Sequence, residues 1–228
     1  ATGAPTSTAA TAPSTAPSNG WTGKTFCDIG SGAGRLVIAA AALHPGLRLS
    51  KGVEYLTSCH NFAQGVVGMC QPQQDGTGQT YAQTHTQTHT QTQTQTQLRL
   101  RIPGETKDPS SSSFLPMAPI DLQNGSIGDT DNIFIGDVDV AFVASSAMPT
   151  EVLTMISEAV GEQCQPGTIV ITTDYEIPTQ GRLVNKEYPG RDVRYRFELL
   201  EAMDGYCWVV GGKSTAYFYR LVEGCKGT

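Results

Sequence analysis

The sequence predicts an α/β domain in which strands and helices alternate and which ends in an antiparallel hairpin. Two observations lead to this prediction. The segment 25–43 has the pattern of a buried strand, a glycine-rich turn and an apolar helix, and further strand-like and helix-like segments follow it up to residue 172. From residue 195 on, runs rich in aromatic and β-branched residues continue without a helix. The 228 residues are enough for one such domain with a substantial core.

The glycine-rich turn, 28–35, is the most informative stretch of the chain. Its glycines allow unusual backbone angles and leave room for a ligand pressed against the backbone, where a Cβ would block it. The free amides at the start of the following helix face the same space. Ligands of open α/β sheets bind at this end of the strands, so we expect a binding site here.

The spacing of the glycines separates two classes of cofactor. A dinucleotide fingerprint, Gly-x-Gly-x-x-Gly, would place its third glycine at position 35, which is Arg35. Here the third glycine is Gly34, and the acidic Asp28 precedes the first glycine, Gly30, by two residues. This acidic Gly-x-Gly-x-Gly pattern resembles the first motif of class I S-adenosylmethionine (SAM) methyltransferases.

Glu54 follows the strand-like run 47–53 and lies 20 residues after Gly34. A carboxylate at the end of the second strand accepts both ribose hydroxyls of a bound nucleoside. Because NAD sites share this geometry, Glu54 indicates an adenosine-type ligand and does not by itself select SAM. The alternative is a glycine turn that only packs helix on strand, with Glu54 a solvated strand end.

Composition limits the classes of function. Hydrophobic residues make up 39% and charged residues 16%, and the net charge is −6, so no signal favours binding to a nucleic-acid backbone. No apolar run approaches the length of a membrane span. The six cysteines form no Cys-x-x-Cys pair, which favours reduced thiols in an intracellular compartment, and no metal site is expected.

The remaining elements follow in order. Residues 1–22 are predicted to be a disordered leader and 23–228 the domain, with a low-complexity insertion at 71–113. A short strand is expected at 98–102, at the margin of this insertion. The other expected elements are a strand at 47–54, a helix at 56–69, a strand end and loop at 121–128, a strand at 139–143, a helix at 150–160, a strand at 168–172, and antiparallel strands at 195–200, 206–210 and 215–222.

Several of these stretches resemble the disruptor-of-telomeric-silencing family, the non-SET histone lysine methyltransferases, and its protist relatives. Asp28–Gly32 is similar to the family's first motif, and Leu43–Pro45, Gly52–Glu54 and His60 are similar to its second strand and helix. Further similar stretches are the adenine loop at 124–127, the fourth strand through the fifth at 139–143, 151–152 and 165–170, and the closing strand at 212–218. The resemblance implies a Rossmann-like, mostly parallel methyltransferase sheet with a C-terminal antiparallel hairpin.

The resemblance also implies a function: methyl transfer from SAM to a protein lysine of a histone-type partner. The protein would then be nuclear, and otherwise cytoplasmic. The residues expected to bind the cofactor are Phe26, Asp28, Gly30, Ser31, Gly32, Gly34, Arg35, Glu54, Ser126 and Ile127. The candidate catalytic residues are Ser145, which would orient the amine, and Tyr217 and Phe218, which with Trp208 would wall a dry channel that favours the neutral amine.

The sequence departs from this family at three functional positions. The family has asparagine at the end of the fourth strand, where this chain has Ala144 and Ser145; it has tyrosine at Phe218 and an acid at Ser126. Two alternatives therefore stay open beside a protein lysine methyltransferase. One is a methyltransferase that acts on a small molecule, and the other is a truncated or non-catalytic relative that binds SAM.

Overall fold

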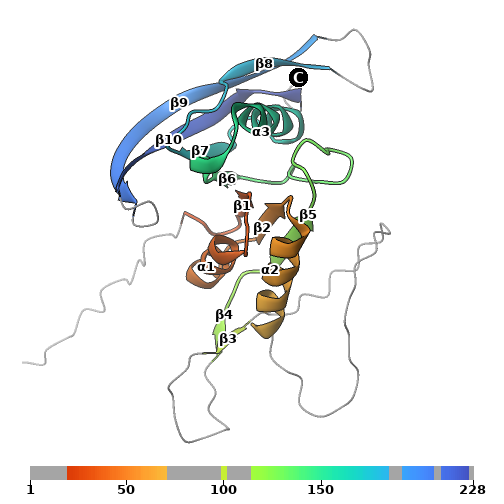
Figure 1. The fold of residues 1–228 in the computed structure, drawn as a ribbon, viewed down its shortest axis with the longest axis vertical. Coiled ribbons are helices and arrows are strands. Elements are labelled where there is room, and N and C mark those ends of the chain that lie inside the picture. The colour runs from red at the N-terminus through yellow and green to blue at the C-terminus, as the bar shows by residue number, and fades with distance from the viewer. Residues whose placement is uncertain (1–19, 71–98, 102–113, 185–191, 208–211, 226–228) are drawn as a thin grey trace, which may run out of the picture.

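The computed structural model of the chain describes residues 20–70, 99–101, 114–184, 192–207 and 212–225. Their main feature is an eight-stranded sheet with the order β5-β2-β1-β6-β7-β10-β9-β8 (Figure 1). The parallel strands are β1 (Thr25–Ile29), β2 (Leu49–Glu54), β5 (Ile120–Asn124), β6 (Val140–Val143) and β7 (Ile169–Thr173). The antiparallel strands are β10 (Gly212–Glu223), β9 (Asp192–Cys207) and β8 (Gln180–Val184). The predicted α/β fold, mostly parallel with a C-terminal hairpin, is confirmed.

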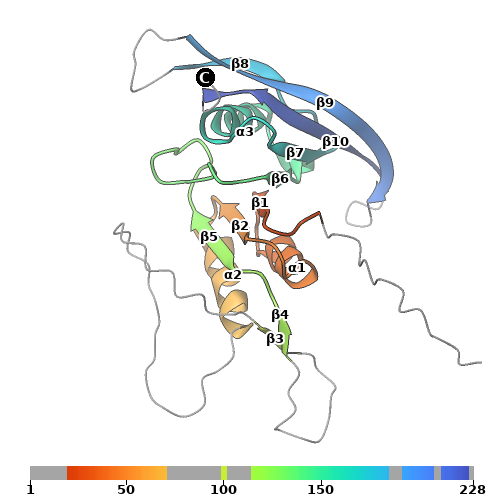
Figure 2. The ribbon, with the colours of Figure 1, turned by 180° about the vertical axis from the view of Figure 1, so that it is seen from behind.

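Three helices cover the two faces of the parallel strands (Figures 1 and 2). They are α1 (Arg35–Leu43), α2 (Thr57–Met69) and α3 (Thr150–Gln163). The chain moves outward in one direction through β1, β2 and β5 and in the other through β6 and β7, so right-handed crossovers place α1 and α2 on one face and α3 on the other. The order reverses between β1 and β6, which is the switch point of the sheet.

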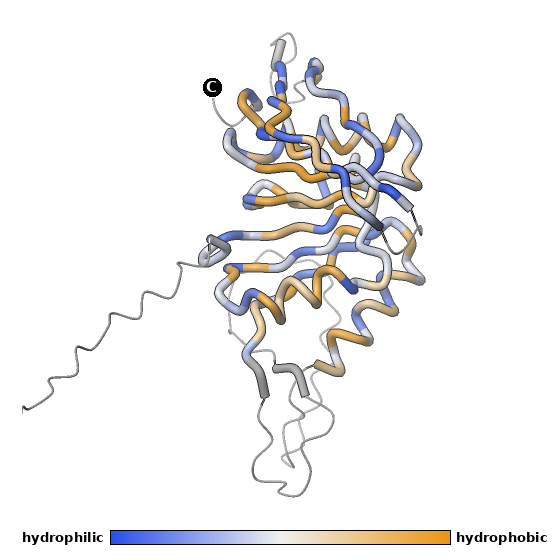
Figure 3. The backbone as a smooth tube through the Cα atoms, turned by 90° about the vertical axis from the view of Figure 1, so that its left-hand side faces the viewer, coloured by the Kyte–Doolittle hydropathy of each residue, from blue (hydrophilic) through white to orange (hydrophobic). Residues whose placement is uncertain are grey.

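Each face carries its own hydrophobic cluster. On the α3 face, buried residues of the central strands such as Ile29 and Val143 pack with Leu153 and Ile156 of the helix. On the α1 face, Phe26 packs with Ala41 and Leu47. Figure 3 shows the hydrophobic stretches gathered along the stacked strands in the middle of the molecule. The central strands are largely continuous apolar runs, such as Val140–Val143, because helices cover both of their faces.

The C-terminal half differs from the prediction in two ways. The runs 195–200 and 206–210 were predicted as separate strands, but residues 192–207 form the single strand β9. The polar residues in the middle of β9 remain part of the strand because they pair with β10. This pairing extends along β9 and contains register shifts, such as the one at Phe218/Tyr219. Strand β8 carries no strong strand pattern and was not expected; it is held by its pairing with β9. The short strand predicted at 98–102 is present as β3 (Arg99–Arg101) and pairs with β4 (Phe114–Pro116).

The limits of the domain are partly described. The predicted leader, 1–22, lies outside the described residues up to residue 19, and Trp21 already stacks on His44 with ring centroids 5.1 Å apart. Of the predicted insertion, 71–98 and 102–113 lie outside the described residues. None of the five cysteines described forms a disulfide. Within the described ranges no cluster of metal-ligating side chains occurs, and no helix is long and apolar enough to cross a membrane.

Candidate functional site

The glycine turn between β1 and α1 adopts the backbone that its sequence requires. Gly30, Gly32 and Gly34 have φ values of 83°, 52° and 74°, in the left-handed region that side chains rarely enter. The amides of Gly30 and Ser31 donate to the carbonyl of Val53, at 2.8 and 3.0 Å, which ties the turn to the end of β2. A Cβ at Gly32 would meet no atom within 4 Å, so the turn is open to a ligand at this residue.

Glu54 ends β2 and points at the turn. Its Oε2 accepts a hydrogen bond from the Gly32 amide and its Oε1 accepts one from the Leu56 amide, each at 2.7 Å. The residue is only 8% exposed. A carboxylate has about four lone-pair sites, so each oxygen keeps one for a further donor such as a ribose hydroxyl. The structure therefore places the Glu54 carboxylate beside the glycine turn.

Asp28 supplies a second buried carboxylate, at the end of β1. It is 5% exposed, and no described residue donates a hydrogen bond to it. Burial, and to a lesser extent the charge of Glu54, raise its pKa from the usual 3.8 to about 7. A buried acid without a donor is costly unless a ligand supplies one. The Asp28 carboxyl can therefore pair with a cation or accept a hydrogen bond from an N–H group of a ligand.

The end of β5 is fastened to the end of β2. Asn124 Nδ2 donates to the Glu54 carbonyl at 2.7 Å, and the Gly125 amide donates to the same carbonyl at 3.0 Å. The next residue, Ser126, is half-buried, and its Oγ accepts from the Gly128 amide at 3.3 Å. Three parallel strands therefore present the glycine turn, the carboxylate and the 124–127 loop at one edge of the sheet. This edge lies beside the switch point, where open α/β sheets bind ligands.

The expected cofactor residues are not all at this crevice. Arg35 is exposed at the first position of α1, and Ile127 is buried in the core on the α3 face. Phe26 lies at the other end of β1, edge-to-face with Trp21 at 6.3 Å, so the structure does not bring it to the crevice. The residues that come together are Asp28, Gly30, Ser31, Gly32, Gly34 and Glu54, with Ser126 on the neighbouring strand end.

The three candidate catalytic residues are placed on other strands. Ser145, fully buried after β6, bonds through its hydroxyl to the backbone of Thr173 and Tyr175. Tyr217 and Phe218 are consecutive in β10 and pair in regular register with β7, so they point to opposite faces of the sheet. Tyr217 packs toward the α3 face and stacks on Tyr219, with ring centroids 6.4 Å apart. Trp208 lies outside the described residues.

Two residues outside the expected site also lie beside the crevice: Met148, to which the sequence did not point, and His60, which it linked to the family resemblance alone. The Met148 methyl group lies 2.6 Å from where a Cβ at Gly30 would be, so this glycine makes room for a side chain from the segment before α3. His60 of α2 is 7% exposed, and burial lowers its pKa while the nearby charge of Glu54 opposes this shift. Met148 has no recognisable sequence signal, because only the packing of a distant segment brings it to Gly30.

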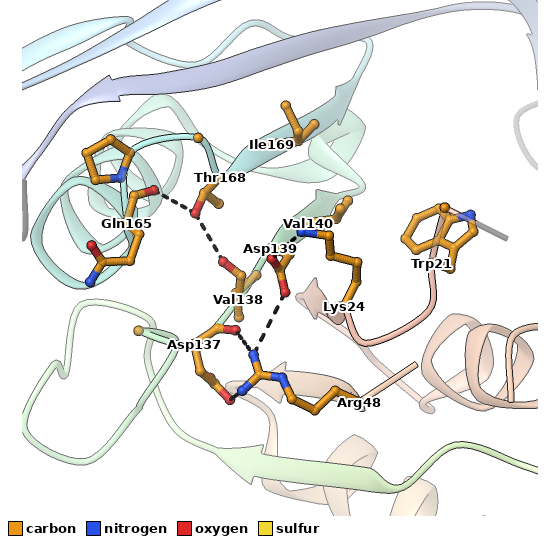
Figure 4. Close-up of a pocket in the computed structure, with 14 residues that line it drawn as sticks. Trp21, Lys24, Arg48, Asp137, Val138, Asp139, Val140, Gln165, Thr168 and Ile169 are labelled. Atoms are coloured by element: carbon orange, nitrogen blue, oxygen red, sulfur yellow. Dashed lines mark hydrogen bonds and ion pairs between the residues drawn. The ribbon is translucent and has the colours of Figure 1, made fainter. Parts of the chain in front are cut away.

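A cavity of about 680 Å³ lies at the opposite end of the strands, before β1, β6 and β7 (Figure 4). Its charged groups pair with one another. Lys24 Nζ lies 3.0 Å from Asp139 Oδ1, and Arg48 Nη2 donates to the Asp137 carbonyl at 2.6 Å and lies 3.8 Å from Asp139 Oδ2. Because these charges compensate each other, the cavity shows no group awaiting a ligand. The crevice at the other end of the strands is the stronger candidate.

No family model and no curated protein matches the chain. Solved structures of similar fold include MtNAS in complex with MTA and tNA, at 12% identity and a TM-score of 0.47 over 88% of this chain and 54% of that one. The rRNA methyltransferase AviRa from Streptomyces viridochromogenes has 12% identity and a TM-score of 0.48 over 89% and 78%. A SAM-dependent methyltransferase from Clostridium acetobutylicum has 10% and 0.46 over 89% and 85%. The chain thus spans about half the length of the first. Similarity at this level carries no argument about what the chain binds.

Proposed function

We propose that the chain is a SAM-dependent methyltransferase whose acceptor is a lysine of a protein. The observation that carries the proposal is the pair of buried carboxylates around an open glycine turn: Asp28 without a donor, and Glu54 aimed at Gly32. An adenosine-type cofactor needs a carboxylate for its ribose, and a cationic one needs an acid close to the turn. A dinucleotide meets the first need, but it would place its anionic diphosphate at the glycine turn, close to the second acid, Asp28.

The residues of the crevice fit this cofactor. Gly32 leaves the backbone accessible, Glu54 keeps acceptor sites for two hydroxyls, and Asp28 offers an anion to the ammonium group or the sulfonium. When bound, SAM supplies an electrophilic methyl group on its sulfonium. The work of the chain is then to align the acceptor with that methyl group and to exclude water, since methyl transfer needs little acid–base machinery.

A protein lysine is the favoured acceptor because of the resemblance at 28–32 and along the later strands. A lysine must lose a proton before it attacks, and a desolvated position lowers its pKa. Tyr217, half-buried and level with Thr172 at the end of β7, is the aromatic residue best placed to help exclude water at this edge.

A small-molecule acceptor is the second candidate, and one observation favours it. Tyr217 and Phe218 face opposite sides of the sheet and the Ser145 hydroxyl is engaged by backbone groups, so these three residues do not together wall a channel of lysine width. A crevice lined by Asp28 and Glu54 without such a channel would admit a free amine or a small nucleophile directly.

Calorimetric titration of the full chain with SAM, S-adenosylhomocysteine and NAD tests the cofactor. We expect SAM to bind, and Glu54→Ala to weaken binding about 10- to 100-fold, because hydrogen bonds to charged groups contribute about 1.5–3 kcal/mol. Glu151→Gln, on the exposed first turn of α3, is the matched control and should leave affinity unchanged. Binding of NAD without SAM would overturn the proposal.

Incubation with methyl-labelled SAM tests the acceptor. Core histones, lysine-rich peptides and a panel of small amines and phenols are supplied in parallel, and the labelled product is identified by mass spectrometry. Label on lysine supports the proposal, and label on a small molecule alone supports the second candidate. SAM binding without transfer to any acceptor would favour a non-catalytic relative.

A further inference from the structure

The far half of β9 is an open sheet edge. Pairing between β8 and β9 ends at Gln180 and Arg196, with a last hydrogen bond from the Phe197 amide to the Thr179 carbonyl at 2.7 Å. From Glu198 to Cys207, β9 pairs only with β10 within the described part of the chain. Figures 1 and 2 show this part of the hairpin as a long curved ribbon that β8 accompanies only at one end. Such an edge offers a row of unpaired N–H and C=O groups to another chain.

This edge lacks the lysine and proline residues that most often protect a sheet edge, although a register shift at Phe218/Tyr219 interrupts its regular pairing. Sheet edges are usually short, or carry lysine or proline, so that they do not pair with other chains. The segment 198–207 contains no lysine, arginine or proline. Four of its apolar or aromatic side chains are 41–74% exposed: Leu199, Leu200, Met203 and Tyr206. An exposed apolar edge of this length is the usual platform for strand addition.

The negative charge of this edge favours a basic partner. Glu198, Glu201 and Asp204 are all exposed. Arg220 of β10 lies opposite Glu198 in the ladder, but no described cation forms an ion pair with Glu198 or Glu201. A second copy of 198–207 would bring three further acids to this edge and no cation, and like charges on adjacent strands are destabilising. Glu198 and Glu201 lie on one face of β9, so a segment with lysine or arginine at alternate positions would instead pair with these two. We infer that residues 198–207 of β9 bind an extended basic peptide segment as an added strand.

The edge is within reach of the crevice. Strand β10 runs antiparallel to β7, and Ala216 pairs with Thr173, the last residue of β7, and with Met203 of β9. The hairpin beyond this row therefore projects past the edge of the sheet that carries Gly30 and Glu54. Four strand steps separate β9 from β1, about 19 Å, and an added strand lies about 24 Å away. From the row of Met203, which is level with the end of β7, an extended chain covers that distance in roughly seven residues.

If the chain is a protein lysine methyltransferase, as proposed above, the bound peptide is part of its substrate. A basic segment docked on β9 would hold the substrate while a lysine roughly seven residues along the same chain enters the crevice. Binding energy far from the reacting atoms would then position the acceptor. The substrate class is accordingly a protein with an extended, lysine-rich segment, and not a free amine.

Fluorescence anisotropy on the full chain without SAM tests the docking edge. The probe is a labelled peptide of alternating lysine and valine. We expect it to bind, and Glu198→Gln/Glu201→Gln to weaken binding about tenfold, as for the loss of two exposed charge pairs. The control Glu151→Gln/Glu162→Gln removes the same charge from α3 and should have little effect. The same peptide with alternate residues N-methylated keeps its charge but cannot form the ladder, and it should not bind.

Equal binding of the N-methylated peptide, or equal loss in the control variant, would overturn the inference. So would a stable dimer in sedimentation that Glu198→Gln/Glu201→Gln strengthens, since the edge would then belong to a second copy. The two proposals fail separately. Peptide binding without methyl transfer counts against the enzyme alone, whereas lysine methylation that is indifferent to the double variant counts against the edge alone.

Discussion

At the scale of single residues, the crevice concentrates features that cost stability. Three glycines occupy left-handed backbone within five residues, and Asp28 is buried with no donor among the residues that the structure describes. Neither feature helps the chain to fold, and both are of the kind that persists at binding sites because the surrounding structure holds it in place. We expect the stability that these residues cost to be linked to ligand binding, and variants of single residues test this link.

Asp28→Asn should change how stability depends on pH. The folded-state pKa of about 7 exceeds the usual 3.8, so the folded protein retains a proton that the unfolded chain has lost between these values. Stability therefore falls as pH rises from about 4 to about 7, by up to about 4 kcal/mol, and the variant should lack this fall. Urea unfolding at pH 5 and pH 8 measures it. An identical pH dependence in both proteins would contradict the assignment.

The same carboxylate predicts a proton linkage in binding. A cationic cofactor beside Asp28 favours the ionised acid, so SAM binding below about pH 7 should release a proton and should tighten as pH rises toward 7. Calorimetry in buffers of different ionisation enthalpy measures the release. Asp28→Asn should show none, and release from the variant equal to that from the parent would place the titrating group elsewhere.

Gly32→Ala and Gly65→Ala form a matched pair. A Cβ meets no atom within 4 Å at either glycine, but Gly32 has φ 52° whereas Gly65 lies within α2. We expect Gly32→Ala to cost about 1–2 kcal/mol of stability and to weaken SAM binding at least tenfold, because the new methyl group occupies the approach of the ligand. Gly65→Ala should add about 1 kcal/mol without affecting SAM. Urea unfolding measures the stability of both variants, and calorimetry measures their affinity for SAM. Unchanged SAM affinity in Gly32→Ala would show that SAM does not contact the turn.

At the scale of elements, strand ends are fastened to one another by side chains. Glu54 and Asn124 join the ends of β2 and β5, and Lys51 joins the middle of β2 to the segment before β6. Lys51 is 3% exposed; its Nζ lies 2.6 Å from Asp137 Oδ1, 3.1 Å from the Phe134 carbonyl and 5.0 Å from the centre of the Phe134 ring. This buried cation orders the connection between β5 and β6, where the described structure has a loop.

Lys51→Met should destabilise the protein by about 1–3 kcal/mol, since Asp137 loses its close ion pair and keeps only Arg48 at 4.0 Å. The comparison is Lys24→Met, which breaks a pair of similar length, 3.0 Å, at a half-exposed position. That change should cost less than 1 kcal/mol. Chemical denaturation measures both, and equal losses would show that burial does not set the contribution of Lys51.

At the scale of the whole molecule, the sheet has two unequal halves. The parallel half is covered by helices, and its strands alternate buried and half-buried residues or are buried throughout, as in β1. In the distal hairpin, residues 198–206 of β9 are all exposed. The parallel half holds the crevice. The β9–β10 hairpin extends past the carboxyl ends of the parallel strands, where the crevice lies. The fold thus joins the candidate site to an exposed hairpin.

Amide hydrogen exchange should reproduce this division. The amides of β1 and β6 lie in the core and should exchange only on global unfolding, whereas those of 198–207 should exchange by local opening. The lysine–valine peptide should slow exchange in 198–207 and leave β1 unchanged. Mass spectrometry of peptic fragments measures both regions, and equal protection in the two halves would contradict the division.

The sequence by itself determined the local chemistry of the site. Three glycines at Gly30, Gly32 and Gly34 after an acidic strand end require one backbone shape, and the structure confirms it. The position of Glu54 followed from strand length and spacing, and the first strand, helix and second strand followed from their apolar periodicity. These features depend on residues that are close together in the sequence, so they can be predicted from the sequence alone.

Only the tertiary structure decided which residues meet across the sheet. Met148 covers Gly30, Lys51 binds the Asp137 segment, and β9 runs unbroken because β10 pairs along it. Packing also kept Phe26 in the core and separated Tyr217 from Phe218, since neighbouring residues of a strand face opposite ways. Such contacts arise from pairing between distant segments, and no local pattern of residues encodes them.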